Sequence, residues 1–364
     1  MLVTRLRGRS FRNLGDVELE VSPGITLICG PNGAGKTNLL EALYFGLTGA
    51  TWRTRTDREL IRFGDDLTRV EAEVDAAGEP RRFIASVGRG ERRHRRVNGK
   101  PIPAGEPAGR PPVGVFSPDR LVLVKGPPAV RRDHLDRFVA ALWPARAEAR
   151  RSYGRALAQR NALLGRIRAR AAPETALDAW DHELAVEGVR VIAARRQATE
   201  RLAGPFAALS AELGLAGDAM LRYAPRSEGE DAERLAAELR ERRAGDLERG
   251  HTGHGPHLDE LELRLEGRSL RRFGSQGEQR SALLALLFSE RAALIEADAG
   301  PPLMLLDDVM SELDADRRRL LTETLAEAGQ ALITATETSQ FPEECERVEV
   351  QVRAGRIAPF ALAA

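Results

Sequence analysis

The sequence predicts an α/β protein that contains an antiparallel β part and is interrupted by an all-helical insertion. Strand-like segments, either apolar throughout or alternating with charged residues, are confined to residues 1–128 and 247–364. Between them, residues 129–246 are dominated by alanine, leucine, arginine and glutamate and contain no strand pattern. We therefore expect residues 1–128 and 247–364 to fold together as one domain, with residues 129–246 forming a separate helical domain.

The composition is that of a globular chain without a strong charge bias. The 364 residues are 42% apolar and 30% charged, with a formal net charge of +1, and this length is sufficient for a large core. No apolar stretch approaches the roughly 20 residues that span a bilayer, and the N-terminus lacks the apolar region of a signal peptide. The two cysteines, Cys29 and Cys345, fit a reducing compartment. We therefore expect a cytoplasmic protein.

Strands dominate the prediction for the N-terminal part. A turn at Ala77-Gly78 separates two alternating segments and predicts an antiparallel hairpin, and Asn98-Gly99 predicts another tight turn. The strands are expected at 17–21, 25–29, 68–74, 82–87 and 113–116.

Helices dominate the insertion. Apolar residues recur at helical spacing on both sides of a turn at 171–175, which predicts a helical hairpin. Further helices are expected near 202–213 and 231–243. After the insertion, a long helix is predicted over 276–297, with strands at 258–265, 302–306 and 331–334.

The octapeptide 30–37 is the strongest motif of the chain. It follows the apolar run 25–29 and leads into a helix that starts near Asn38, which is the context of a phosphate-binding loop. Glycines allow backbone N–H groups to surround phosphate oxygens, and the helix N-terminus attracts the same anion. The motif predicts that ATP or GTP binds at Gly30, Pro31, Asn32, Gly33, Ala34, Gly35, Lys36 and Thr37. Lys36 would reach the β- and γ-phosphates, and the Thr37 hydroxyl would ligate Mg²⁺.

Residues 303–308 form a second nucleotide motif, in which four apolar residues end in two carboxylates. A buried strand that ends in aspartate after a phosphate loop predicts a Walker B element. Asp307 would hold Mg²⁺ through water, and Asp308 would polarise the attacking water. We therefore assign catalytic roles to Lys36, Asp307 and Asp308.

Residues 275–280 precede the long predicted helix and allow two interpretations. Ser275 and Glu278 match a helix capping box. Ser275 and Gly277, the latter 30 residues before Asp307, also resemble the signature motif of ABC-type ATPases. In that class the motif contacts the γ-phosphate held by a partner subunit. The resemblance implies that Ser275 and Gly277 bind nucleotide across an ATP-dependent homodimer, and residues 311–314 resemble the D-loop of the same class.

The spacing of these motifs and several shorter segments narrow the resemblance. The 239 residues from Lys36 to Ser275 exceed the spacing in transporter ATPases and resemble the DNA-handling SMC, Rad50 and RecF group. The chain closely resembles the RecF family of bacterial recombinational repair proteins, which implies an ABC-type P-loop ATPase head. The segments that carry the resemblance are 10–14, 38–43, 115–121, 124–128, 131–133, 135–136, 255–259 and 307–314.

The RecF resemblance implies residues, cofactors and partners. Arg12, Asn13 and Asn38 would join the phosphate loop in binding ATP with Mg²⁺. The closed dimer would clamp duplex, gapped or junction DNA at single-strand gaps, help load RecA together with RecO and RecR, and take part in the SOS response. Asp308 replaces the glutamate of transporters, and no switch histidine follows the strand 331–334. Since a misplaced base lowers the rate steeply, we expect slow, DNA-stimulated hydrolysis.

Two rival functions share the nucleotide site. A transporter-type subunit is disfavoured by the long insertion, and a Rad50-like enzyme with a nuclease partner is disfavoured by the short insertion without a Cys-x-x-Cys hook.

Two arginine clusters are candidate contacts for DNA phosphates. A solvated surface is the better explanation for any single arginine, and the two interpretations are balanced for the run from Arg89 to Arg96. The candidates are Arg53, Arg55 and Arg58 in the first cluster and Arg89, Arg92, Arg93, Arg95 and Arg96 in the second. His251, His254 and His257 suggest a metal site, but their segment lacks cysteines. A structural role, or one near the nucleotide, is favoured for His257.

Overall fold

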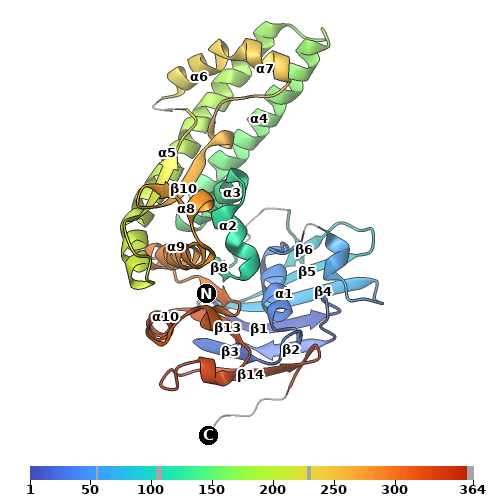
Figure 1. Ribbon diagram of the computed structural model, residues 1–364. Coiled ribbons are helices and arrows are strands. Elements are labelled where there is room, and N and C mark those ends of the chain that lie inside the picture. The colour runs from blue at the N-terminus through green and yellow to red at the C-terminus, as the bar shows by residue number, and fades with distance from the viewer. Residues whose placement is uncertain (55, 104–108, 228–230, 359–364) are drawn as a thin grey trace. The chain divides into compact units, whose positions relative to one another are not determined.

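The computed structural model describes residues 1–54, 56–103, 109–227 and 231–358. The chain divides into two compact units, Met1–Arg120 with Gly300–Ala364 and Leu121–Ala299 (Figure 1). These bounds differ from the predicted boundaries after residues 128 and 246. Residues 247–299, predicted to complete the first domain, pack within the second unit.

The first unit contains a six-stranded, largely parallel sheet with the strand order β15-β14-β3-β13-β12-β8. β3 (Ile25–Cys29), β12 (Leu303–Leu306) and β13 (Gln330–Ala335) are buried along their whole length, as expected for central strands of a parallel sheet. The outer strands are β8 (Val113–Phe116), β14 (Val348–Arg353) and β15 (Arg356–Ile357), the last of them antiparallel to β14.

A second sheet of the first unit is antiparallel, in the order β2-β1-β4-β5-β6-β7. The helix α1 (Lys36–Thr48) packs on β4 and β5 and is buried over most of its length (Figure 1). The predicted hairpin at Ala77-Gly78 and the turn at Asn98-Gly99 are confirmed. The strands are β1 (Leu2–Arg9), β2 (Val17–Glu20), β4 (Leu67–Ala76), β5 (Glu79–Gly88), β6 (His94–Val97) and β7 (Lys100–Pro101).

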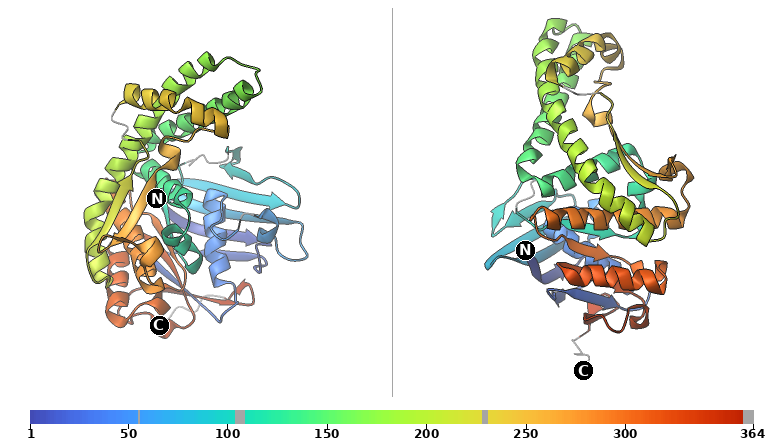
Figure 2. Two further views of the ribbon diagram at one scale, coloured as in Figure 1. Left: turned by 45° about the horizontal axis from the view of Figure 1, so that its top comes forward. Right: turned by 90° about the vertical axis from the view of Figure 1, so that its left-hand side faces the viewer.

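A helical hairpin forms the frame of the second unit. α4 (Ala147–Arg168) and α5 (Leu177–Glu212) run antiparallel and contact each other along their length (Figure 2). The turn predicted at 171–175 joins them, and the predicted helix near 202–213 is the end of α5. The other helices are α2 (Val122–Lys125), α3 (Pro128–Leu142), α6 (Ala232–Glu241), α7 (Arg243–Arg249), α8 (Leu270–Phe273) and α9 (Gln276–Glu296).

The prediction that residues 129–246 are all helical is wrong at one place. β9 (Ala219–Ala224) lies in this range and pairs antiparallel with β10 (Glu260–Leu265), which in turn pairs with β11 (Arg268–Ser269). The strand is only six residues long, and its partner β10 is 36 residues away in sequence. Its hydrogen-bonding partner is therefore set by tertiary structure rather than by a local pattern.

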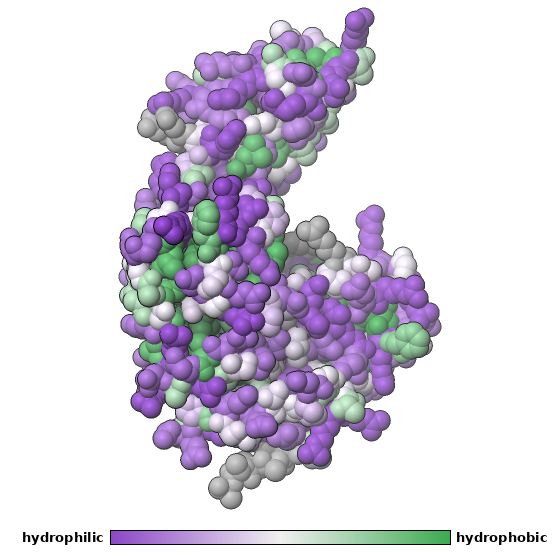
Figure 3. All heavy atoms as spheres, viewed as in Figure 1, coloured by the Kyte–Doolittle hydropathy of each residue, from purple (hydrophilic) through white to green (hydrophobic). Residues whose placement is uncertain are grey.

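Hydrophilic side chains cover most of the face of each unit that is visible in Figure 3. Among the described residues, no helix is long and apolar enough to cross a membrane.

Candidate nucleotide-binding site

The phosphate loop, residues 30–37, connects β3 to α1. Gly30 and Gly35 have φ values of 157° and 113°, which favour glycine because a side chain would be strained there. A Cβ atom at Gly30 would meet the Val352 carbonyl oxygen, and one at Gly35 would lie 2.9 Å from Asn13 Oδ1. No side chain caps the N-terminus of α1, so its first N–H groups remain available to an anion.

The Lys36 ammonium is held at the mouth of the loop. Its Nζ atom donates to the carbonyl oxygens of Gly30 at 2.7 Å and Pro31 at 3.2 Å. The residue is only 8% exposed. A buried ammonium on backbone carbonyls is positioned for the phosphate oxygens that the loop would enclose.

Thr37 and Asp307 are brought together from opposite ends of the chain. The Thr37 hydroxyl lies 2.7 Å from Asp307 Oδ1, and Thr334 Oγ1 donates to the same oxygen at 2.8 Å. Burial raises the pKa of Asp307, while the hydrogen bonds from Thr37 and Thr334 lower it, and the net direction is upward. A carboxylate next to a hydroxyl provides the hard oxygen ligands that Mg²⁺ prefers, so these residues fit the predicted metal site.

Asp308 adopts an unusual backbone conformation. Its φ of 53° and ψ of 30° are left-handed, a region that few residues other than glycine enter. Its backbone N–H donates to Thr334 Oγ1 at 2.9 Å. Its Oδ1 atom is buried, and no described residue forms a hydrogen bond with it. The carboxylate therefore retains an oxygen for a ligand or water.

Asn13 and Asn38 form a chain of hydrogen bonds to the phosphate loop. Asn13 Nδ2 donates to the Gly33 carbonyl at 3.0 Å, and Asn38 Nδ2 donates to Asn13 Oδ1 at 2.8 Å. Arg12, also predicted to bind nucleotide, instead forms a bidentate ion pair with the fully buried Glu41, at 2.5 and 2.9 Å. Neither Arg12 nor Asn13 lines the cavity in front of the loop, so their contact with nucleotide stays a prediction.

A cavity of about 380 Å³ lies in front of the loop. Its lining residues are Asn32, Gly33, Gly35, Lys36, Thr37, Asn38, Arg53, Pro118, Asp307, Asp308 and Thr334. Five residues of the phosphate loop thus line one cavity together with the two carboxylates of the Walker B element, whereas Gly30, Pro31 and Ala34 do not line it. Thr334 was not singled out from the sequence, because a threonine at the end of an apolar strand carries no motif.

Arg53 was predicted as a candidate DNA contact, but it lines this cavity. Its guanidinium donates to Asn38 Oδ1 at 2.7 Å and to Asp119 Oδ2 at 3.0 Å. The Asp119 carboxylate belongs to the segment 115–121 quoted above. An arginine held beside the phosphate loop can contact nucleotide phosphate. The sequence did not indicate this, because Arg53 lies near Arg55 and Arg58 and was grouped with them.

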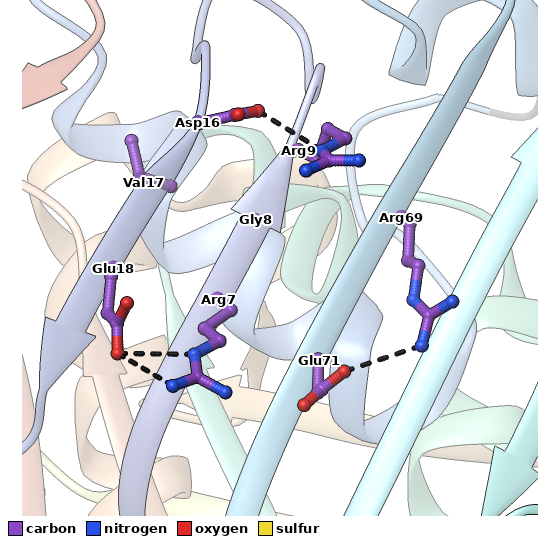
Figure 4. A pocket seen from close by; sticks show the side chains of 8 residues that line it. All are labelled: Arg7, Gly8, Arg9, Asp16, Val17, Glu18, Arg69 and Glu71. Atoms are coloured by element: carbon purple, nitrogen blue, oxygen red, sulfur yellow. Dashed lines mark hydrogen bonds and ion pairs between the residues drawn. The ribbon is translucent and has the colours of Figure 1, made fainter.

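A second hollow, of about 530 Å³, lies on the exposed face of the antiparallel sheet. It differs from the first because its arginines already face carboxylates. Arg7 pairs with Glu18, Arg9 with Asp16 and Arg69 with Glu71 (Figure 4). This mixed-charge surface has neither a glycine loop nor a free helix N-terminus, so it does not suit a triphosphate.

The signature segment begins α9 in the second unit. Ser275 Oγ accepts from the Glu278 N–H at 3.2 Å, and the Ser275 N–H donates to Glu278 Oε2 at 2.7 Å. The predicted capping box is confirmed. A Cβ atom on Gly277 would meet no atom closer than 4.0 Å, so its surroundings are open. Contact of Ser275 and Gly277 with nucleotide in a partner subunit stays a prediction.

The histidines of the segment 251–257 have separate partners. His257 Nε2 donates to the Thr252 carbonyl at 2.9 Å, so its Nδ1 accepts from the Tyr153 hydroxyl at 2.7 Å. Burial lowers the pKa of His257, which favours this neutral form. His254 pairs with Glu238 at 2.6 Å. Among the described residues, no cluster of three or more histidine, cysteine, aspartate or glutamate side chains could hold a metal.

Several arginines of the predicted DNA-contacting clusters serve the fold. Arg93 donates to Asp57 and to the Gly49 carbonyl, and Arg89 pairs with Asp66. Arg92 and Arg96 are exposed and have no ion pair among the described residues. Arg55 lies outside the described residues.

Comparisons with known proteins agree with this geometry. A family model described as an AAA domain matches residues 5–102. A DNA replication and repair protein RecF from Anaeromyxobacter dehalogenans is 38% identical over 99% of this chain and 100% of its own length. The RecF protein of Myxococcus xanthus is 40% identical over 93% of this chain and 92% of its own length.

Solved structures extend the comparison. A structure of the recombination mediator protein RecF with ATP matches with a TM-score of 0.88 and 28% identity, and it covers 99% of this chain and 98% of that one. An SMC head bound to a winged-helix domain of ScpA matches with a TM-score of 0.60 and 16% identity over 100% and 98% of the two chains. The latter likeness shows a shared fold.

Proposed function

The chain belongs to the RecF family of DNA replication and repair proteins, and we propose that it binds ATP with Mg²⁺ and hydrolyses it slowly to control DNA binding. One observation carries the nucleotide part of this proposal. The Thr37 hydroxyl and Asp307 Oδ1 lie 2.7 Å apart in the lining of a cavity that Lys36 and Asp308 also line, and Asp308 Oδ1 has no hydrogen-bond partner among the described residues. These are the groups that phosphate, Mg²⁺ and an attacking water require.

Each residue has a defined task in the proposed reaction. The backbone N–H groups of residues 33–37 and the Lys36 ammonium hold the phosphates, and Arg53 adds a second positive charge beside them. Mg²⁺, when bound by Thr37 and Asp307, neutralises charge on the β- and γ-phosphate oxygens. The Asp308 carboxylate orients the attacking water. Its short side chain and left-handed backbone limit how far it can follow the water, which supports slow hydrolysis.

Dimerisation would couple the nucleotide to DNA. In the proposed assembly, Ser275 and Gly277 of one copy approach the γ-phosphate that the loop of the other copy holds. The open surroundings of Gly277 and the exposed start of α9 leave room for such a partner. The closed dimer would clamp DNA at gaps or junctions and act with RecO and RecR to load RecA. Hydrolysis would then open it.

The test is fluorescence anisotropy of a labelled gapped duplex titrated with protein at fixed salt, with and without ATP and Mg²⁺. We expect ATP to tighten DNA binding at least about tenfold, a coupling energy of about 1.4 kcal/mol. Ser275→Arg should remove this effect, because a bulky cation would block the approach of the partner subunit. The variant should still bind ATP, since Ser275 lies outside the cavity of its own chain.

Two outcomes would contradict the proposal. DNA binding that is absent in both conditions would favour a transporter-type or partner-driven ATPase. DNA binding that ATP tightens equally in the wild type and in Ser275→Arg would separate DNA binding from dimerisation through the signature segment. A sedimentation measurement on the same samples would report the oligomeric state directly.

A further inference from the structure

We infer that Thr334 is a positioning residue. Its single hydroxyl group holds the carboxylate of Asp307 and the backbone of Asp308, the two acidic residues of the Walker B element. Its Oγ1 atom donates to Asp307 Oδ1 at 2.8 Å and accepts from the Asp308 backbone N–H at 2.9 Å. The inference rests on the proposed function, because it assigns Thr334 a task in the same hydrolysis reaction.

Sheet register places Thr334 at this point. β12 and β13 are parallel, and Leu306 pairs with Ile333, so the residue after each pair emerges at the same edge of the sheet. Thr334 is completely buried, with 0% exposure. Its side chain can therefore reach Asp307 and Asp308 but has little freedom to choose other partners.

The direction of both hydrogen bonds follows from donor chemistry. A backbone N–H can only donate, so the Thr334 oxygen must accept from Asp308. The single hydroxyl proton is then available for the Asp307 carboxylate, which accepts it. One group thus connects the side chain of the proposed metal-binding aspartate with the backbone of the proposed catalytic aspartate.

For Asp307, Thr334 acts as a second donor beside Thr37. In the described part of the chain, these two hydroxyls are the side chains that hydrogen-bond to its carboxylate. If Thr37 served as a ligand to Mg²⁺, the hydrogen bond from Thr334 would still hold the orientation of the Asp307 carboxylate. Ligand orientation by such outer contacts tunes metal affinity.

For Asp308, Thr334 compensates an unfavourable backbone conformation. The left-handed φ of 53° is disfavoured for aspartate relative to glycine, and the N–H bond to Thr334 helps to hold it. The carboxylate direction depends on this backbone conformation. Removal of the hydroxyl would leave the N–H without its partner and release the residue toward ordinary dihedral angles.

The experiment compares Thr334→Val, which keeps the shape but removes the hydroxyl, with Thr334→Ser, which keeps the hydroxyl. A matched control is Thr26→Val in the neighbouring strand β3. Thr26 is also 0% exposed, but its hydroxyl has no hydrogen-bond partner among the described residues. The measurements are kcat and the Mg²⁺ dependence of ATP hydrolysis, the Kd of a fluorescent ATP analogue in EDTA, and the melting temperature.

We expect Thr334→Val to lower kcat by about 10- to 100-fold, because the water-orienting carboxylate is misplaced. Its Kd for nucleotide in EDTA should stay within about twofold of wild type, since Lys36 and the loop are untouched. Thr334→Ser should restore kcat to within about threefold, and Thr26→Val should hydrolyse ATP like the wild type. A kcat against Kd split of this kind separates positioning from a general loss of structure.

A Thr334→Val variant with wild-type kcat and Mg²⁺ dependence would overturn the inference and leave the proposed function intact. Equal losses in Thr334→Val and Thr334→Ser would also overturn it, because the hydroxyl would then be irrelevant. If Thr334→Val fails to fold, the Thr334→Ser result alone decides, since only retention of activity fits the inference. A wild-type protein that binds no nucleotide would instead refute the proposed function, and with it the inference.

Discussion

At the residue scale, the phosphate loop depends on backbone conformation as much as on charge. Gly30 and Gly33 both have positive φ, at 157° and 78°, but their surroundings differ. A side chain at Gly30 would collide with the Val352 carbonyl, whereas one at Gly33 would meet nothing within 4 Å. The two glycines of one motif therefore serve different purposes. At Gly30 a side chain is excluded by the close approach of β14, whereas at Gly33 only the backbone conformation favours glycine.

This contrast predicts different consequences for two alanine substitutions. Gly30→Ala should displace the loop and weaken ATP binding by at least about tenfold, because Val352 is completely buried and its carbonyl cannot move cheaply. Gly33→Ala should cost only the conformational strain, about 1 kcal/mol of folding stability. Titration with a fluorescent ATP analogue and thermal unfolding check both. Equal affinity in the two variants would contradict the steric argument.

Residue identity also explains what the sequence could and could not predict at the site. Lys36, Thr37, Asp307 and Asp308 were predicted because motifs of fixed spacing carry them, and the structure brings all four to one cavity. Arg53 was predicted only as a candidate DNA contact. Its position beside the loop depends on hydrogen bonds to Asn38 and Asp119, partners 15 and 66 residues away in sequence.

At the element scale, a buried polar network ties the second unit together. Arg160 on α4 is completely buried and donates to Asp181 on α5 at 2.6 Å and to Asp246 on α7 at 2.7 Å. It also donates to Thr252 Oγ1 at 2.8 Å. Three helices and the following loop thus share one guanidinium, which fixes their mutual register more specifically than apolar contacts would.

Loss of this guanidinium should destabilise the second unit strongly. Arg160→Met should lower the free energy of unfolding by about 3 kcal/mol, because Asp181 and Asp246 lose their fully buried partner. As ion-pair partners among the described residues, they then keep only Arg243 and the half-exposed Arg249. Arg155→Met on the same helix is the matched control. Arg155 pairs with Glu148 at a side-chain exposure of 67%, so its loss should cost less than about 1 kcal/mol. Urea denaturation measures both, and similar losses would show that burial is not the cause.

Elements with long periodic patterns were predicted well, as were the short apolar strands β3, β8 and β12, whereas β1 and β9 were missed. The helical hairpin of α4 and α5, the helix α9 and the strands β4 and β5 follow from their patterns, with shifts of a few residues at the ends. β1 was missed because arginines occupy its exposed positions and interrupt the apolar signal. β9 was missed because it is short and its hydrogen-bonding partner, β10, is distant in sequence.

At the scale of the whole molecule, charge distribution matters more than net charge. The chain has 55 lysines and arginines against 54 acidic residues, and many arginines in the described part form internal ion pairs. Arg92 and Arg96 are exceptions on the antiparallel sheet region. If DNA phosphates meet the protein there, these two side chains are available without breaking an existing bond.

Their contribution is testable through the salt dependence of DNA affinity. Each phosphate contact changes the slope of log K against log salt by about 0.9. The double variant Arg92→Gln and Arg96→Gln should reduce that slope by about 2 if both contact the backbone. Anisotropy titrations between low and physiological salt give the slope. An unchanged slope in the double variant would exclude contacts of Arg92 and Arg96 with DNA phosphates. Arg93→Gln is not a suitable control, because it would remove the hydrogen bonds to Asp57 and to the Gly49 carbonyl.

The sequence by itself determined the α/β class, the phosphate loop, the Walker B strand and the family resemblance, because each depends on residues close together or at fixed spacing. Tertiary structure alone decided where the compact units divide, that Arg12 pairs with Glu41, and that Thr334 bridges Asp307 and Asp308. Those contacts join residues from a helix, strands and loops that meet only when the fold assembles. Local patterns report which segments are helices or strands, whereas the geometry of a site depends on how those segments pack.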